Sequence, residues 1–95
     1  MIELVVPDAL TGHALLDDDR LSLVREMVGR CVFAFDGPLD AGLRIAEQLS
    51  EDSPSPVLVN DVTGESGDKR IVDVYMHQGG RRRSVSEGVE RPLPE

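Results

Sequence analysis

Short apolar runs separated by polar breaks predict two strands in the first part of the chain. The run Ile2 to Val6 is rich in β-branched residues and ends at Pro7, which cannot donate a ladder hydrogen bond, so we expect a strand over 2–6. Residues 31–35 are apolar at every position, which requires both faces of that strand to be covered. The sequence therefore predicts a central strand over 31–35, next to strand 2–6 or strand 57–62.

Apolar residues at spacings of three and four predict two helices. In the first, over about 18–29, the run Asp17 to Asp19 suits the start, and Gly29 and Arg30 suit the end. The second covers about 39–51, and Gly42 inside it is compatible with close packing against a sheet. Residues 13–16 fit either an edge strand or an entry into the first helix, and the pattern does not decide between them.

The second half of the chain predicts an antiparallel hairpin followed by a tail. Two β-rich runs, 57–62 and 70–76, are joined by a short glycine-containing segment. Ile71, Asp73 and Tyr75 alternate with an apolar set and should form a half-exposed face. From Gly79 onward the apolar periodicity stops, so we expect one compact domain over 1–78 and a flexible tail over 79–95.

Together these elements predict a two-layer α/β sandwich. We expect about four strands in a mixed sheet, with two helices mainly on one face and the flexible tail at the C-terminal end.

Charge and composition narrow the functional classes. The chain has 95 residues with 18 acidic and 10 basic side chains, a net charge of −8, and the acidic excess lies before residue 81. Such a body should repel nucleic acid, so only the tail is suited to attract it. No apolar stretch approaches the about 20 residues that span a bilayer, and no basic segment precedes the first strand. The sequence predicts neither a membrane span nor a signal peptide, and we expect an intracellular, cytoplasmic protein.

Few residues are candidates for catalysis or metal binding. Cys31 lies in an apolar strand that should suppress its thiolate, and His13 and His77 have no recognisable companions for catalysis. Three consecutive aspartates, 17–19, point in different directions and fit helix capping better than metal binding. We therefore expect no cofactor, no metal site and no enzymatic activity, while a small enzyme remains the third alternative.

Several segments resemble a family of bacterial proteins of unknown function. The resemblance covers residues 31–83, through the strand 32–37, the following helix, the run 56–64 (PVLVNDVTG) and the glycine- and arginine-containing segment 80–83. It implies a compact α/β body and a bacterial source. Members of that family carry a further segment resembling a ribbon-helix-helix DNA-binding unit, which has no counterpart in residues 1–95, and the resemblance transfers no functional residue.

These observations favour a small accessory or regulatory protein that acts by binding another protein. The candidate partner-binding residues are a basic run that can hold anionic groups and the half-exposed face of strand 70–76: Arg81, Arg82, Arg83, Ile71, Asp73 and Tyr75. We expect strand 70–76 to lie at the edge of the sheet, where it also allows a homodimer by strand addition. The alternative is a nucleic-acid-associated regulator that uses the basic tail, or an acidic mimic of nucleic acid.

Overall fold

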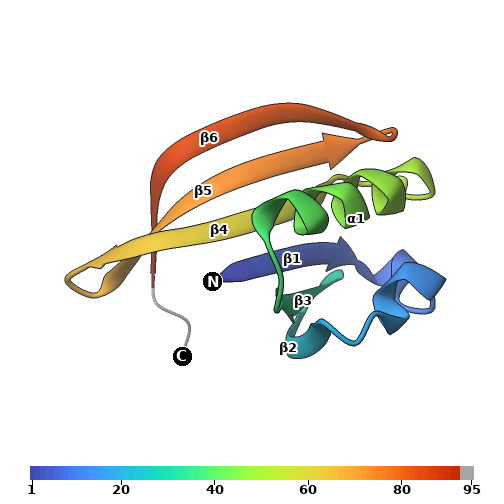
Figure 1. The fold of residues 1–95 in the computed structure, drawn as a ribbon, viewed down its shortest axis with the longest axis horizontal. Coiled ribbons are helices and arrows are strands. Elements are labelled where there is room, and N and C mark those ends of the chain that lie inside the picture. The colour runs from blue at the N-terminus through green and yellow to red at the C-terminus, as the bar shows by residue number, and fades with distance from the viewer. Residues whose placement is uncertain (93–95) are drawn as a thin grey trace.

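A single six-stranded antiparallel sheet organises the chain. The computed structural model describes residues 1–92, and its strands are ordered β2-β3-β1-β4-β5-β6 (Figure 1). Their bounds are β1 Ile2–Pro7, β2 Leu21–Met27, β3 Arg30–Phe35, β4 Val57–Ser66, β5 Lys69–Gln78 and β6 Arg81–Pro92. Within residues 1–92 there is one α-helix, α1 (Leu39–Glu51), which connects β3 to β4, and two 3-10 turns, Asp8–Leu10 and Ala14–Asp17, connect β1 to β2.

One face of the sheet packs against α1 and contains the main core. Side chains alternate along β1, so Leu4 and Val6 face the helix while Glu3 and Val5 face away from it. Leu49 and Ala46 of α1 are fully buried against this face. Gly42 packs so closely that an added Cβ would lie 3.3 Å from the Phe35 ring, which confirms the close packing expected there.

The predicted sandwich with a four-stranded mixed sheet and two helices is wrong. Strands 2–6 and 31–35 are present and pair with each other, and the hairpin of 57–62 with 70–76 is present as β4 and β5. All neighbouring strands are antiparallel, however, and two more strands stand where a helix and a flexible tail were expected.

The expected helix over 18–29 is instead a hairpin strand. β2 pairs with β3 through the two-residue turn Val28-Gly29, in which Gly29 has φ 82°. Asp18 accepts a hydrogen bond from the Arg20 amide at 2.9 Å and so stabilises a turn rather than a helix start. A strand here satisfies backbone groups of β3 that a helix would leave unpaired, and this tertiary gain outweighs the helical spacing.

The expected flexible tail is largely a strand. Residues 81–92 form β6, which pairs along β5. Gly79 and Gly80, the first two residues of the expected tail, form the tight turn of this hairpin with φ values of 64° and 80°. Residues 93–95 of the predicted tail lie outside the described residues.

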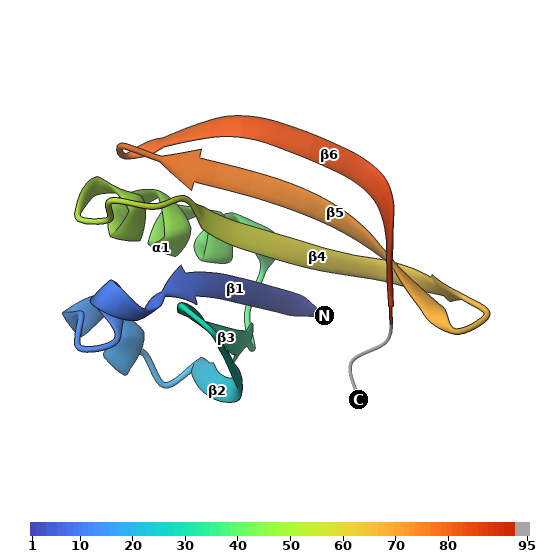
Figure 2. The same ribbon diagram turned by 180° about the vertical axis from the view of Figure 1, so that it is seen from behind.

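The sheet is strongly coiled rather than flat. Figures 1 and 2 show β6 bending sharply toward the end of the sheet where β1 begins, while its pairing with β5 continues as far as Pro92. A register irregularity at residues 87–88, with Gly88 at φ 65°, lies within β6, and bulges of this kind bend a strand. Because of this coiling, three valines on the face opposite α1 are also buried: Val5, Val32 and Val72.

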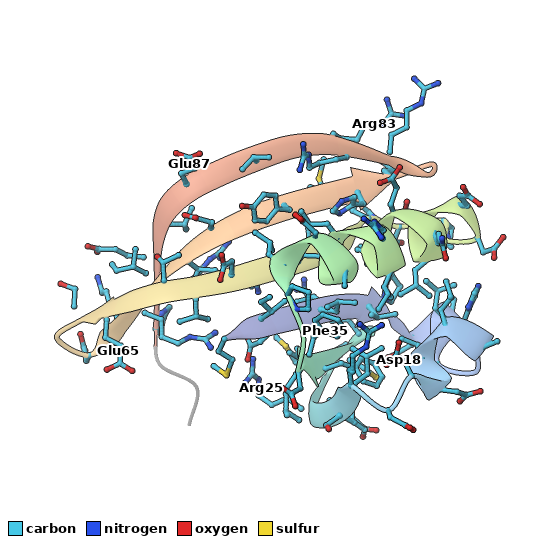
Figure 3. All side chains as sticks on the ribbon, viewed as in Figure 1. Asp18, Arg25, Phe35, Glu65, Arg83 and Glu87 are labelled. Carbon is cyan, nitrogen blue, oxygen red and sulfur yellow. The ribbon has the colours of Figure 1, made fainter. Side chains whose placement is uncertain are left out.

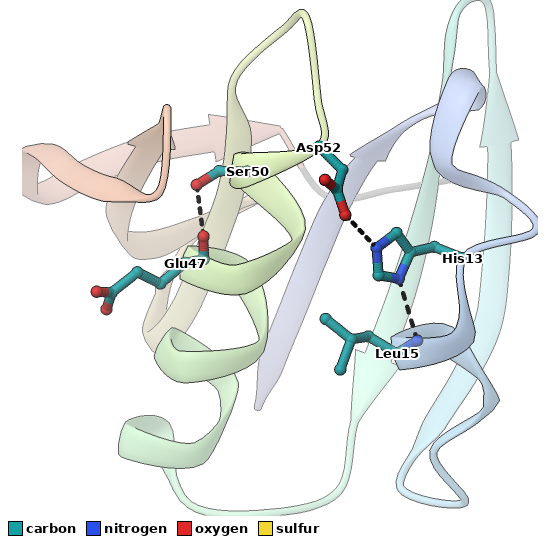
Figure 4. Close-up of polar contacts among 5 residues, drawn as sticks. All are labelled: His13, Leu15, Glu47, Ser50 and Asp52. Atoms are coloured by element: carbon teal, nitrogen blue, oxygen red, sulfur yellow. Dashed lines mark hydrogen bonds and ion pairs between the residues drawn. The ribbon is translucent and has the colours of Figure 1, made fainter.

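Polar contacts attach the end of α1 to the rest of the fold. The Ser50 hydroxyl donates to the Glu47 carbonyl at 2.7 Å and accepts from the Gly80 amide at 2.9 Å, which joins the helix to the β5–β6 turn. Nearby, His13 Nδ1 accepts from the Leu15 amide, so the proton lies on Nε2, which donates to Asp52 at 2.9 Å (Figure 4). Residues 13–16, undecided from sequence, lead into the second 3-10 turn.

His77 is a core residue on β5. It is 1% exposed, and within residues 1–92 its Nδ1 has no hydrogen-bond partner. Burial lowers the pKa of His77 below its usual 6.5, so the imidazole is held neutral in the folded protein.

The lowered pKa of His77 makes stability depend on pH. Unfolded His77 takes up its proton near pH 6.5, whereas the folded protein does so only at lower pH, so stability present above pH 6.5 is lost as the pH falls below it. We predict that the free energy of unfolding, measured with urea, declines between pH 7.5 and pH 5.5. His77→Gln should remove most of this decline, and the control His13→Gln should not. An unchanged decline in His77→Gln would contradict the assignment.

Candidate functional site

The residues proposed for partner binding lie on the last hairpin of the sheet. Arg81, Arg82 and Arg83 begin β6, and Ile71, Asp73 and Tyr75 lie on β5 beside it. β5 pairs with β4 on one side and with β6 on the other, so strand 70–76 is not an edge of the sheet. The outer edge at this side is β6.

Two of the β5 residues are engaged by β6. The guanidinium carbon of Arg82 lies 5.9 Å from the centre of the Tyr75 ring, and Asp73 Oδ1 accepts from the Gly88 amide at 2.9 Å. Burial raises the pKa of Tyr75, so its hydroxyl stays protonated at neutral pH. Asp73 and Tyr75 therefore support β6, and the surface open to a partner is β6 itself.

The outer side of β6 is exposed along its whole length. Every residue from 81 to 92 is exposed except the half-buried Val89, and within residues 1–92 no strand pairs with this side. Arg83 and Glu87 project outward from it (Figure 3). The edge therefore offers backbone hydrogen-bonding groups beside a basic N-terminal half.

A second cluster, on the face opposite α1, was not found from sequence. A cleft of about 350 Å³ is lined by residues from all six strands. We call it the arginine cleft, after four of its lining residues, Arg25, Arg30, Arg70 and Arg91; the others are Val5, Met27, Val32, Leu58, Asn60 and Pro92. No sequence motif indicates the arginine cleft, because each strand contributes only one or two of its lining residues.

Glu3 is the acidic partner within this cluster. Its side chain is 3% exposed, and Oε1 accepts from Arg70 Nη2 at 3.2 Å, while Oε2 lies 3.7 Å from Arg25 Nη2. Arg70 is itself 9% exposed, so this is a buried ion pair between residues 67 positions apart. Arg25 remains one-third exposed, so its longer contact contributes less.

Two other groups considered in the sequence are buried or ion-paired. Cys31 is buried, and desolvation raises the pKa of its thiol, so it is not an activated nucleophile. Asp18 pairs with Arg20 at 2.8 Å, and the hydrogen bonds from Arg20 lower the Asp18 pKa to about 2. Within the described part of the chain, no group of three or more acidic, histidine or cysteine side chains could hold a metal ion.

Comparisons with known proteins place no further constraint on function. No protein-family model, curated protein sequence or solved structure matches this chain. The resemblance of residues 31–83 to a bacterial family therefore stays a prediction. Over residues 1–92, no helix is both long enough and apolar enough to cross a bilayer.

The buried pair of Glu3 and Arg70 gives a stability prediction. Glu3→Ala leaves the Arg70 guanidinium buried without its carboxylate, which should lower the free energy of unfolding by about 3 to 5 kcal/mol. Glu65 lies directly opposite Arg70 on β4 but is exposed, so Glu65→Ala is the matched control and should change stability by about 0.5 kcal/mol or less. Urea unfolding measures both. Equal effects of the two substitutions would show that Glu3 is not a buried ion-pair partner.

Proposed function

We propose that this protein is a small accessory or regulatory protein that binds another protein through the outer edge of β6. The partner supplies an extended, acidic segment that adds to the sheet as a seventh strand. The observation that carries the proposal is the 12-residue exposed edge of β6, with three arginines at its start.

Backbone pairing supports strand addition at this edge. A strand at the end of a sheet has a row of N–H and C=O groups without protein partners, and an extended segment can satisfy them. β6 is irregular near Arg83 and at 87–88, where the register with β5 shifts. Bulges and charged side chains limit indiscriminate pairing, so the edge should accept only a segment whose side chains suit it.

Charge supports an acidic partner segment. Arg81 and Arg83 are exposed, and guanidinium groups bind carboxylates through paired hydrogen bonds. The rest of the protein carries an acidic excess, so attraction to an acidic segment must be local to β6 and should weaken as salt rises. The same acidic excess argues against nucleic acid as the main ligand.

A pair of model peptides tests this proposal by NMR titration of the labelled protein. The acidic peptide TEVEVEVT should shift the β6 amides and bind at least about tenfold more tightly than the basic peptide TKVKVKVT at low salt. Arg83→Glu should weaken binding of the acidic peptide about tenfold, because it replaces a favourable charge pair with a repulsive one. Arg44→Glu on α1 makes the same charge change at an exposed position away from the edge and should have little effect.

Two outcomes would contradict the proposal. Equal binding of the two peptides, or no shift of β6 amides at millimolar acidic peptide, would exclude recognition of an acidic strand. Sedimentation of the protein alone tests whether a second copy of the chain occupies the edge instead. A stable dimer that Arg83→Glu dissociates would show that a second copy, rather than an acidic partner, takes this position.

A further inference from the structure

The arginine cleft concentrates positive charge in an acidic protein. It is lined by four of the ten basic side chains of the chain, whose net charge is −8. Within residues 1–92, the carboxylate that forms ion pairs with these arginines is that of Glu3, which is already shared between Arg70 and Arg25. Arg30 and Arg91 have no ion-pair partner within residues 1–92, so the cleft keeps an excess of positive charge.

Arg70 is incompletely satisfied by the protein. Its side chain is nine-tenths buried, and within the described residues Nε and Nη1 have no hydrogen-bond partner. Only Nη2 is used, by Glu3. Burying guanidinium nitrogens without acceptors is unfavourable, and since these two nitrogens are inaccessible to solvent, an anion in the cleft would stabilise Arg70 through its charge or after a small shift of the side chain.

The register of β5 and β6 brings a second arginine to the same position. Arg91 is the direct cross-strand partner of Arg70, and like charges directly opposite each other destabilise a sheet. No carboxylate of residues 1–92 forms an ion pair with Arg91. A bound anion between the two guanidinium groups would convert this repulsion into two favourable contacts.

The rest of the cleft is aliphatic. Val5, Met27, Val32, Leu58 and Pro92 line it beside the arginines, and Asn60 adds one amide. A volume of about 350 Å³ is at the small end of ligand clefts. The lining therefore suits a small molecule with an anionic head and a short apolar body.

We propose that the arginine cleft binds a small amphipathic anion, with a carboxylate or phosphate head group held by Arg70, Arg91 and Arg30 and a short aliphatic body against the cleft wall. This site and the proposed strand addition use different arginines, because Arg81, Arg82 and Arg83 do not line the cleft; of β6, only its last two residues, Arg91 and Pro92, line it. It does not depend on the proposed strand addition, and each can fail without the other.

Three ligands with the same six-carbon body test the site. Hexanoate, hexyl phosphate and hexanol are titrated into the labelled protein, and amide shifts are followed by NMR. Both anions should give saturable shifts at the cleft residues of β3, β5 and β6, which carry Arg30, Arg70 and Arg91, and hexanol at the same concentrations should not. The anion that binds with the higher affinity shows whether the cleft prefers a carboxylate or a phosphate head group.

Variants and a fourth ligand complete the test. Arg91→Ala and Arg30→Ala alter exposed side chains, so the fold should persist, and each should weaken anion binding at least about tenfold. Arg81→Ala removes another arginine from β6 outside the cleft and should leave the affinity unchanged. Inorganic phosphate should bind more weakly than hexyl phosphate.

The proposal fails if hexanol shifts the same amides as strongly as the anions do. It also fails if the anions give no saturable shift at concentrations up to about 20 mM, because any dissociation constant above that value is too weak for a specific site. It also fails if Arg91→Ala and Arg30→Ala both bind as wild type. Equal affinity for inorganic phosphate and hexyl phosphate would overturn the aliphatic part of the assignment.

Discussion

The coiling of one sheet around its central strand is the constraint on which the other features depend. β1 lies in the middle of the sheet and is buried on both faces, with Leu4 and Val6 against α1 and Glu3 and Val5 on the other side. A flat sheet would leave that second face open to water, because α1 covers only one face. Coiling brings the ends of β2 and β6 to the same cleft and allows Glu3, Val5 and Val32 to be buried without a second helix.

The same coiling explains why several arginines come together in one cleft. Arg25 and Arg91 belong to strands at opposite edges of the sheet, yet both line one cleft. Glu3 lies between them on the central strand and neutralises only part of their charge. A protein with a net negative charge therefore contains a basic cleft. The two proposed binding regions, the edge of β6 and the arginine cleft, use different arginines.

Local sequence patterns correctly predicted the elements that are buried on one face or on both faces. The apolar run 31–35, the alternation in 57–62 and 70–76, and the helical spacing of 39–51 each reflect packing that a strand or helix imposes on its own sequence. The prediction failed for β2 because Leu21, Val24 and Val28 fit a helical spacing, although Val24 is exposed in the strand and Val28 is exposed in the turn that follows it. It failed for β6 because that strand is exposed and polar, and its main signal was the Gly79-Gly80 turn, which is typical of a tight hairpin. The arginine cleft could not be predicted, since it depends on pairing between residues as distant as Glu3 and Arg70.

The most direct test of this account is the distance between the two edges of the sheet. In a flat six-stranded sheet, β2 and β6 would lie about 24 Å apart, five strand spacings, and no proton contact could be observed. The coiled sheet places Met27 of β2 and Pro92 of β6 in the wall of one cleft. We predict nuclear Overhauser contacts from the Met27 methyl group to side-chain protons of Arg91 or Pro92, together with cross-strand contacts between β5 and β6. Random-coil chemical shifts over residues 81–92, without any contact to Met27, would contradict the account.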